Sequence, residues 1–555
     1  NFLASVHVGK TFLGVAFLDI STGEFYAAQG PDAYISKLIQ SFAPAEIIYS
    51  KSNREKFETQ FGEEYATFAL DDWIYAFDFG NEKLIQQFKT STLKGFGIDG
   101  MNEAIIAAGS ILHYLEVTEH KDTQHIAAIA RIDEDKYVWL DKFTIRNLEL
   151  VSSSNEGGVS LLEVLDRTVT PMGSRNLRKW LILPLKEKQV IDERLHIVEQ
   201  FYNDRELAEK ILEQLGQITD LERLISKVAV GRINPRELLQ LKRSLKAIVP
   251  IKDELEKSSS IELKKSGDQL NKCEFLLDKI ERELKDDAPM LIHQGGIIKD
   301  GVDAELDELR AIAFSGKDYL LQIQKREVER TGINSLKISY NKVFGYYLEV
   351  SNANKDKVPA DWIRKQTLVN AERYITEELK VYEEKILHAE EKLQVIEQRL
   401  FAELVRHAAD FIAQIQQNAR VIAALDCLVA FAEIARANQY NKPEISESKR
   451  LAIKAGRHPV IEKQLPVGES YVPNDIYLDN ETQQILVITG PNMAGKSALL
   501  RQTALIVLMA QMGSYIPAEA ATVGLIDKVF TRVGASDNLS RGESTFMVEM
   551  TETAS

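Results

Sequence analysis

Gly490-Pro-Asn-Met-Ala-Gly-Lys-Ser497 is the stretch that decides how the C-terminal part of this chain folds. The apolar run Ile485-Leu-Val-Ile-Thr489 predicts a strand before it, and the apolar periodicity of Ala498–Met509 predicts a helix after it. A glycine loop between a strand and a helix lets backbone N–H groups surround phosphate oxygens. The dipole of the following helix adds positive potential at the same point. The pattern therefore predicts a nucleotide-binding domain.

Each residue type in this loop has a chemical reason to be there. Gly490 and Gly495 let the backbone turn, Lys496 is expected to reach the β- and γ-phosphates, and the Ser497 hydroxyl is expected to ligate Mg²⁺. We predict ATP or ADP with Mg²⁺ as the ligand, and Lys496 and Ser497 as the catalytic pair. The predicted nucleotide-binding residues are Gly490, Pro491, Asn492, Met493, Ala494, Gly495, Lys496 and Ser497. The alternative is a glycine turn that holds no nucleotide.

The composition is that of an ordinary globular protein. The chain has 555 residues, of which 45% are hydrophobic and 27% charged, and the length predicts three to four domains. No apolar run is long enough to span a membrane. Cys273 and Cys427 lie far apart, which argues against a disulfide framework or a thiolate metal site and indicates a reducing cytoplasm.

The first ~115 residues read as mixed α/β. Residues 12–20 and 25–28 predict two strands joined by a turn, and residues 45–49 predict a third strand. Asp19 before the turn could suggest a nuclease-like centre, but such centres need several acids at one site. We therefore expect Asp19 to be a turn residue.

A helical region follows, and it leads into a second notable pattern. Residues 186–257 predict amphipathic helices, and a further helix is expected from residue 305 to residue 330. From Ala360 to Lys442 there is neither glycine nor proline, and a single helix over 366–437 would be about 100 Å long.

Between the two long helices lies a short β-like module. Leu336–Tyr340 and Tyr346–Val350 alternate as paired strands do. Two long helices with a small sheet at their tip predict a clamp arm, and a plain coiled-coil spacer is the alternative. Tyr346 and Tyr347 could stack on a base, although strand tyrosines more often pack locally.

The tip is basic in an acidic chain. Residues 335–375 carry seven basic and four acidic side chains, whereas the whole chain has a net charge of −15. A local basic patch suits contact with the phosphates of double-stranded DNA. The alternative is an ordinary solvated surface. The candidate DNA-binding residues are Lys337, Lys342, Lys355, Lys357, Arg364 and Lys365.

Several motifs together resemble the MutS family of DNA mismatch repair proteins. The resemblance covers essentially the whole chain in the order of the family. The motifs are Thr168-Val-Thr-Pro-Met-Gly-Ser-Arg175, Asn370-Ala-Glu-Arg-Tyr374, Gly456-Arg-His-Pro-Val-Ile461, the phosphate loop, Phe530-Thr-Arg-Val-Gly-Ala-Ser-Asp537 and Ser544-Thr-Phe-Met-Val-Glu-Met-Thr-Glu552.

This resemblance implies a multidomain α/β chain with a long α-helical lever. It implies an RNase H-like connector, a helical core with an inserted β clamp, and a P-loop ATPase domain of ABC type. The expected ranges are 1–118 for the connector, 127–300 for the core, 301–334 for the outgoing lever helix, 335–375 for the clamp tip, 376–442 for the returning lever helix and 443–555 for the ATPase domain.

The resemblance also implies a function and further site residues. Tyr471 stands where the family stacks an aromatic ring on adenine, and Ser544 stands where the family reaches the nucleotide of the partner subunit. The implied function is that of a cytoplasmic, homodimeric mismatch repair ATPase that encircles DNA, switches with ATP and recruits a MutL-type partner. Without the resemblance, Tyr471 would be read as a packed loop residue and Ser544 as a helix cap.

Ala494 stands where the family more often has glycine, and the mismatch-reading domain and the acidic catalytic strand are expected outside residues 1–555. We therefore expect this stretch to bind ATP without hydrolysing it efficiently. One rival is a paralogue that binds branched DNA, and another is a structural ATPase with coiled-coil arms. The second would need longer arms and no sheet at Leu336–Val350. A metabolic kinase would not explain the long arm.

Overall fold

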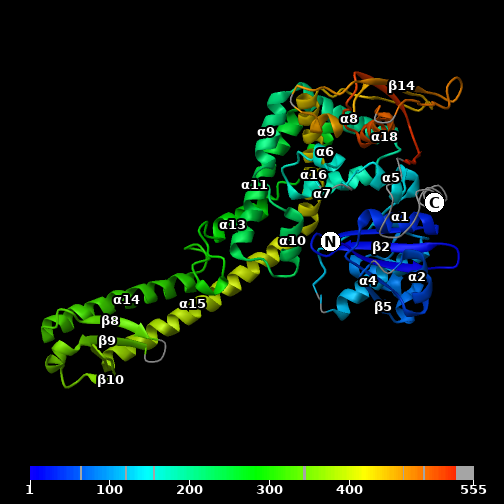
Figure 1. Ribbon diagram of the computed structural model, residues 1–555. Helices are drawn as coiled ribbons and strands as arrows, with labels where there is room; N and C mark the ends of the chain where they lie inside the picture. The colour runs from blue at the N-terminus through cyan, green and yellow to red at the C-terminus, as the bar shows by residue number, and fades with distance from the viewer. Residues whose placement is uncertain are drawn as a thin grey trace. The chain divides into compact units, whose positions relative to one another are not determined.

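The computed structural model describes residues 1–62, 65–118, 120, 122–153, 157–341, 345–466, 468–491 and 494–532. These residues form two compact units (Figure 1). The described parts of Asn1–Arg232, Arg243–Cys273 and Ala409–Ser555 make the larger unit, and Ile233–Lys242 and Glu274–Ala408 make the smaller one. Among the described helices, none combines the length and apolar character needed to cross a bilayer.

The larger unit begins with a mixed sheet, which we call the N-terminal sheet. Its strand order is β5-β4-β1-β2-β3-β6, in which β1, β2 and β3 are successively antiparallel and β4 and β5 run parallel to β1. The strands are β1 (Leu3–Val8), β2 (Leu13–Asp19), β3 (Glu24–Gly30), β4 (Glu46–Ser50), β5 (Thr67–Leu70) and β6 (Ala130–Arg131). The predicted strands at 12–20, 25–28 and 45–49 are confirmed as β2, β3 and β4.

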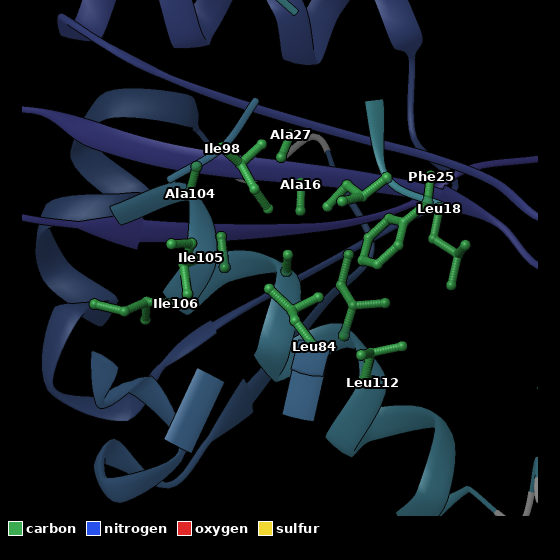
Figure 2. Packing of buried hydrophobic residues seen from close by; sticks show 14 of the residues in the cluster. Ala16, Leu18, Phe25, Ala27, Leu84, Ile98, Ala104, Ile105, Ile106 and Leu112 are labelled. Carbon is green, nitrogen blue, oxygen red and sulfur yellow. The ribbon is translucent and has the colours of Figure 1, made fainter. Parts of the chain in front are cut away.

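Helices cover both faces of this sheet, as the unbroken burial of β2 requires. Val15 and Phe17 pack on one side in a cluster with α1, while Ala16 and Leu18 pack on the other in a cluster with α3 and α4. Figure 2 shows Ala16 and Leu18 in that second cluster together with Leu84 and Leu112. The helices are α1 (Asp32–Phe42), α2 (Arg54–Phe61), α3 (Phe77–Phe88) and α4 (Asn102–Val117), with 3-10 turns at Lys51–Asn53, Asp72–Tyr75 and Lys94–Phe96.

Asp19 is a turn residue, as expected. Its carboxylate accepts hydrogen bonds from the backbone N–H and the hydroxyl of Ser21, at 2.9 and 2.6 Å. Across the described residues, no group of three or more histidine, cysteine, aspartate or glutamate side chains is placed to hold a metal ion.

A helical region follows the N-terminal sheet in the same unit. Its central helix is α16 (Ile412–Asn438), which is buried along most of its length and packs against α7, α8, α9 and α10. The other helices are α5 (Lys142–Asn147), α6 (Leu161–Leu165), α7 (Pro171–Ile182), α8 (Lys188–Asn203), α9 (Arg205–Leu215), α10 (Leu221–Ala229), α11 (Pro235–Lys257) and α12 (Ile261–Asp268). Residues 235–242 of α11 are assigned to the smaller unit. A 3-10 turn at Glu134–Lys136 and the strand β7 (Trp139–Leu140) precede them.

The C-terminal part of the larger unit contains a second sheet, of order β12-β15-β13-β14. Its strands are β12 (Glu444–Ser446), β13 (Leu451–Gly456), β14 (Asn474–Leu478) and β15 (Ala520–Gly524), and its helices are α17 (Ile461–Gln464) and α18 (Lys496–Met512). The short strand β16 (Lys528–Val529) pairs in parallel with β7.

The smaller unit contains two long helices, α14 and α15, a shorter helix, α13, and an antiparallel sheet of order β10-β11-β9-β8. The rings of Tyr319 and Tyr382 stack at 3.8 Å between the helices, and Arg310 pairs with Glu397 at 2.6 Å. The elements are α13 (Glu274–Glu283), α14 (Ala304–Thr331), β8 (Lys337–Asn341), β9 (Gly345–Ser351), β10 (Ile363–Thr367), β11 (Ala371–Ile375) and α15 (Glu377–Ala409), with 3-10 turns at Ile292–Gln294 and Asn352–Lys357. The helix expected over 305–330 and the strand pair at 336–350 are confirmed.

The expectation of one helix over 366–437 is wrong. Residues up to Ile375 belong to β10 and β11, where Tyr374 and Ile375 are buried in the small sheet. The rest divides into α15, which ends at Ala409, and α16, which begins at Ile412 after Phe411 with φ −102° and ψ 10°. A run without glycine or proline permits a long helix. As a strand, however, β11 buries Tyr374 and Ile375 in the small sheet, which favours the strand over the helix.

Candidate functional site

The phosphate loop leads directly into α18. Gly495 occupies the N-cap position with φ 82°, a left-handed conformation that glycine adopts without steric strain. The Ala494 N–H donates to the carbonyl oxygen of Pro491 at 3.3 Å and closes the turn. Asn492 and Met493 lie outside the described residues. The 17-residue helix therefore directs the positive end of its dipole at the loop.

The two predicted catalytic side chains sit at the start of α18. The Lys496 ammonium donates to the carbonyl oxygens of Gly490 and Pro491, each at 2.6 Å, so it lies over the loop. The Ser497 side chain is exposed, and its hydroxyl makes no hydrogen bond with another described residue. This arrangement leaves Ser497 open to a cation and places a positive charge beside the helix N-terminus.

The strand expected at Ile485–Thr489 does not form. These residues pair with no described strand, and Ile485 and Val487 are 81% and 79% exposed. β-branched residues favour a strand only when a neighbouring strand supplies hydrogen bonds and a packing surface. Here no described segment supplies them.

Tyr471 lies half-buried beside a buried histidine. The ring centroids of Tyr471 and His458 are 6.4 Å apart. Burial raises the pKa of Tyr471, so its phenol is neutral at physiological pH. The ring supplies an apolar face, which is what stacking on a base requires.

His458 lies in the motif at residues 456–461 and is buried, and the sequence did not predict it as a site residue. Its Nδ1 accepts the backbone N–H groups of Val460 and Ile461 at 3.3 and 3.2 Å, so the proton of the neutral ring is on Nε2. Burial, aided by the positive charge of Arg501, lowers the pKa of His458 to about 4. Nε2 of His458 and both amide atoms of Gln502 are buried without a described hydrogen-bond partner. Gln502 stands between Arg501 and Thr503, so its sequence neighbourhood does not predict its burial.

The predicted DNA-binding residues lie on the sheet of the smaller unit and its connections. Lys337 is on β8, Lys355 and Lys357 are in the 3-10 turn, and Lys365 is on β10; all are exposed. None of these four lysines forms an ion pair with a described residue. Arg364 pairs with Glu372 at 3.5 Å, and Lys342 lies outside the described residues.

The two strand tyrosines are placed differently from each other. Tyr347 is 6% exposed and lies beneath the guanidinium of Arg373, at 4.4 Å from its ring centroid. Tyr346 packs beside Tyr340 with ring centroids 5.1 Å apart. Local packing, the more frequent role of strand tyrosines, therefore accounts for Tyr347. Ser544 lies outside the described residues.

Three family descriptions match this chain in sequence. They are MutS domain II over residues 1–127, MutS domain III over residues 143–432 and MutS domain V over residues 486–555.

Curated relatives match over the whole chain. The DNA mismatch repair protein MutS of Cytophaga hutchinsonii is 64% identical over 555 residues, which are 100% of this chain and 65% of that protein. The proteins of the same name from Bacteroides fragilis and Flavobacterium psychrophilum are 59% and 57% identical, again across 100% of this chain and 64% of theirs. The chain thus spans about 65% of the length of these relatives.

Proposed function

The chain belongs to the MutS family of DNA mismatch repair proteins, and from that premise we propose that it acts in mismatch repair as a DNA-binding protein switched by ATP. The proposed nucleotide binding is supported by the loop before α18, where Gly495, Lys496 and the exposed Ser497 lie together at a helix N-terminus. Loop N–H groups and Lys496 would bind the phosphates, and Ser497 would ligate Mg²⁺. The Mg²⁺ ion would neutralise negative charge on the phosphates during phosphoryl transfer.

The nucleotide site, in this proposal, is that of a P-loop ATPase of ABC type. Tyr471 stacks on adenine, which its half-buried ring beside His458 supports. Ser544 reaches the nucleotide of a partner subunit, which makes the site composite and the working form a homodimer. The strand order of the N-terminal sheet supports an RNase H-like connector. Recruitment of a MutL-type partner follows from the same family assignment.

The DNA-binding part of the proposal rests on the sheet of the smaller unit. Lys337, Lys355, Lys357 and Lys365 are exposed and have no acidic partner among the described residues. Unpaired lysines gain more from phosphate contact than lysines already held in ion pairs, because no local pair must first be broken. Such contacts supply affinity without sequence preference. The sheet therefore serves as the clamp tip that holds duplex DNA.

The nucleotide proposal is tested by titrating a fluorescent ADP into the chain with Mg²⁺. We expect saturable binding that weakens at least tenfold in Lys496→Ala, because a charge-assisted phosphate contact is lost. Lys528→Ala is the matched control, since Lys528 is also an exposed lysine of this part of the chain. Equal loss in both variants, or no binding by the unaltered chain, would contradict the assignment.

The DNA proposal is tested by duplex binding at several salt concentrations. We expect the triple change of Lys337, Lys355 and Lys357 to Glu to weaken binding and to reduce the salt dependence. Lys392→Glu, an exposed site within α15, is the control. Comparing mismatched, fully paired and branched duplexes separates mismatch repair from a role on junctions. Unchanged duplex binding by the triple variant would contradict the proposal that this sheet contacts DNA.

A further inference from the structure

A second basic surface lies on the larger unit, and we call it the α10–α11 basic surface. Its residues are Arg223, Lys227 and Arg232, on α10 and the turn after it, and Arg243 and Lys246, on the part of α11 in the same unit. All five are exposed, and every exposed side chain in 223–232 and 243–249 is basic. A local positive potential attracts a polyanion even though the whole chain has a net charge of −15.

The amphipathic pattern of α10 places its cations on the outside. The apolar side chains of α10 are buried, and the helix packs against α16. Arg223 and Lys227 are four positions apart, so they share a face of the helix and lie about 6 Å apart along its axis. Arg232 follows in the turn, beside Gly231, where an added Cβ would meet no atom within 4 Å. The backbone at this turn is therefore open to a large ligand.

Hydrogen bonds hold the two helices of this surface together. The Ser244 hydroxyl on α11 accepts the backbone N–H of Thr219 at 3.0 Å and lies 3.0 Å from the Thr219 hydroxyl. Thr219 directly precedes Asp220, whose carboxylate caps α10 by accepting the backbone N–H of Arg223 at 3.3 Å. Arg243 is next to Ser244 in the chain and therefore lies close to the start of α10. The five cations thus belong to one folded surface.

The carboxylates at the start of α10 do not neutralise this surface. The side chains of Asp220 and Glu222 are only 16% and 14% exposed, and both pair with an arginine of α7. Asp220 also contacts Arg223, at 3.3 Å. Arg232 and Arg243 form no ion pair with a described residue. These two arginines can bind phosphates without a local ion pair first being broken.

The exposed residues favour a nucleic acid over a protein as the partner. Residues 170–260 are all described, and none of their large hydrophobic side chains is exposed. Stable protein interfaces depend on aromatic and aliphatic side chains that become buried, whereas phosphate contacts need only cations. Three of the five cations are arginines, whose guanidinium group can bind one phosphate through two donors.

We propose that the α10–α11 basic surface is a second contact surface for the phosphate backbone of duplex DNA, in addition to the sheet of the smaller unit. The inference rests on the proposed DNA binding for the class of ligand, and it adds residues that the sequence did not single out. Contacts of this kind carry affinity without sequence preference. The surface should therefore raise the affinity for mismatched and fully paired duplexes alike, and its contribution should fall as the salt concentration rises.

The test is binding of a fluorescent duplex to the full 555-residue chain, followed by anisotropy at several salt concentrations. We expect Arg232→Ala combined with Arg243→Ala to weaken binding about tenfold at low salt and to reduce the slope of log K against log salt by about 2, because two phosphate contacts are lost. The matched control is Arg178→Ala combined with Lys264→Ala, which removes two exposed cations of the same unit that have no described ion-pair partner. Circular dichroism establishes that both variants are folded.

Lysine footprinting measures contact at this surface directly. We expect the duplex to slow the acetylation of Lys227 and Lys246 by an N-hydroxysuccinimide ester, followed by mass spectrometry, while Lys264 reacts at the same rate with and without DNA. Equal slopes in the two double variants, or equal acetylation with and without duplex, overturns the second surface and leaves the sheet of the smaller unit as the proposed contact.

Two further outcomes separate the inference from its alternatives. Competition by poly-glutamate that matches competition by DNA of equal charge would identify an acidic polypeptide as the partner and overturn the assignment to DNA. No duplex binding by the unaltered chain overturns both this inference and the proposed DNA binding. Loss of binding in the double variant of Arg232 and Arg243, with binding retained in its control, supports the second surface.

Discussion

The hydroxyl of Thr170 donates a 2.6 Å hydrogen bond to the carboxylate of Asp426, and the two residues are 256 positions apart. Asp426 lies on α16 and is completely buried, while Thr170 is the N-cap of α7. The same carboxylate accepts the backbone N–H of Thr170 at 2.8 Å and that of Val169 at 3.0 Å. An internal carboxylate therefore binds the N-terminus of α7, where the helix dipole favours negative charge. This contact explains the motif at residues 168–175, because a Cβ at Gly173 would lie 2.2 Å from an Asp426 oxygen.

Asp426→Asn should lower the free energy of unfolding by about 2–4 kcal/mol. The amide NH₂ would face donors that now bond to an anion, and buried unpaired donors are destabilising. Urea unfolding monitored by circular dichroism measures the change. Thr170→Val should also destabilise, because it removes the N-cap hydroxyl, while Thr170→Ser retains that hydroxyl and is the matched control. Equal stability of the valine and serine variants would contradict this role.

Glu222 should give the chain a pH-dependent stability. Burial and the negative charge of Glu24 raise its pKa to about 7, although Arg175 opposes the shift. The folded chain then holds a proton that the unfolded chain releases above about 4.5, so the free energy of unfolding falls as pH rises from about 4.5 to about 7. The other charged groups at this site are Asp220 before α10, Lys179 on α7 and Arg420 on α16.

The measurement compares the unaltered chain with Glu222→Gln at pH 5 and pH 8. Glutamine does not titrate, so the variant should gain about 1–3 kcal/mol relative to the unaltered chain between the two values. Subtracting the two pH profiles removes the contributions of all other groups. Profiles that stay parallel would show that Glu222 is ionised throughout.

Gln502→Leu should stabilise the chain by about 1–2 kcal/mol. The side chain is completely buried, and neither amide atom has a described partner, so an apolar residue of similar volume removes a desolvation penalty. Thermal unfolding followed by calorimetry reports the difference as a higher Tm. Gln502→Glu should do the reverse because it buries a charge in the same place. A lower Tm for the leucine variant would mean that buried water satisfies the amide.

Gly345→Ala should destabilise the smaller unit. The residue has φ +77°, and a Cβ there would lie 1.8 Å from an oxygen of Glu383 on α15. Both the left-handed backbone and the clash oppose the methyl group, with an expected loss of about 2–4 kcal/mol. Glu383→Ala in the same chain removes the clash and should recover part of the loss, while the backbone strain remains. The measurement is the urea midpoint of the double variant compared with that of Gly345→Ala alone. An equal midpoint in the two variants would contradict the predicted clash with Glu383.

Local patterns in the sequence predicted most of the secondary structure correctly. β2, β3 and β4 follow from short runs rich in β-branched and aromatic residues, and α14 and α18 follow from apolar periodicity. Gly495 was predicted to let the backbone turn in the phosphate loop, and it has a left-handed conformation at the N-cap of α18. These features depend on neighbours in the chain, so the sequence alone carries them.

Contacts with residues distant in sequence decided the secondary structure of the segments that local patterns predicted wrongly. Residues 371–375 are compatible with a helix but form β11 because β9 and β10 pair with it. Residues 485–489 are compatible with a strand but remain unpaired among the described residues. Asp426, Gln511 and Arg194 look like ordinary helix residues in sequence. Only the packing of α16, α18 and α8 brings their side chains to the ends of α7 and to Trp180. The sequence by itself determined the turns and the glycine loop before α18, because those depend on local backbone geometry. The tertiary structure decided which polar groups are buried and paired, because burial depends on residues hundreds of positions away.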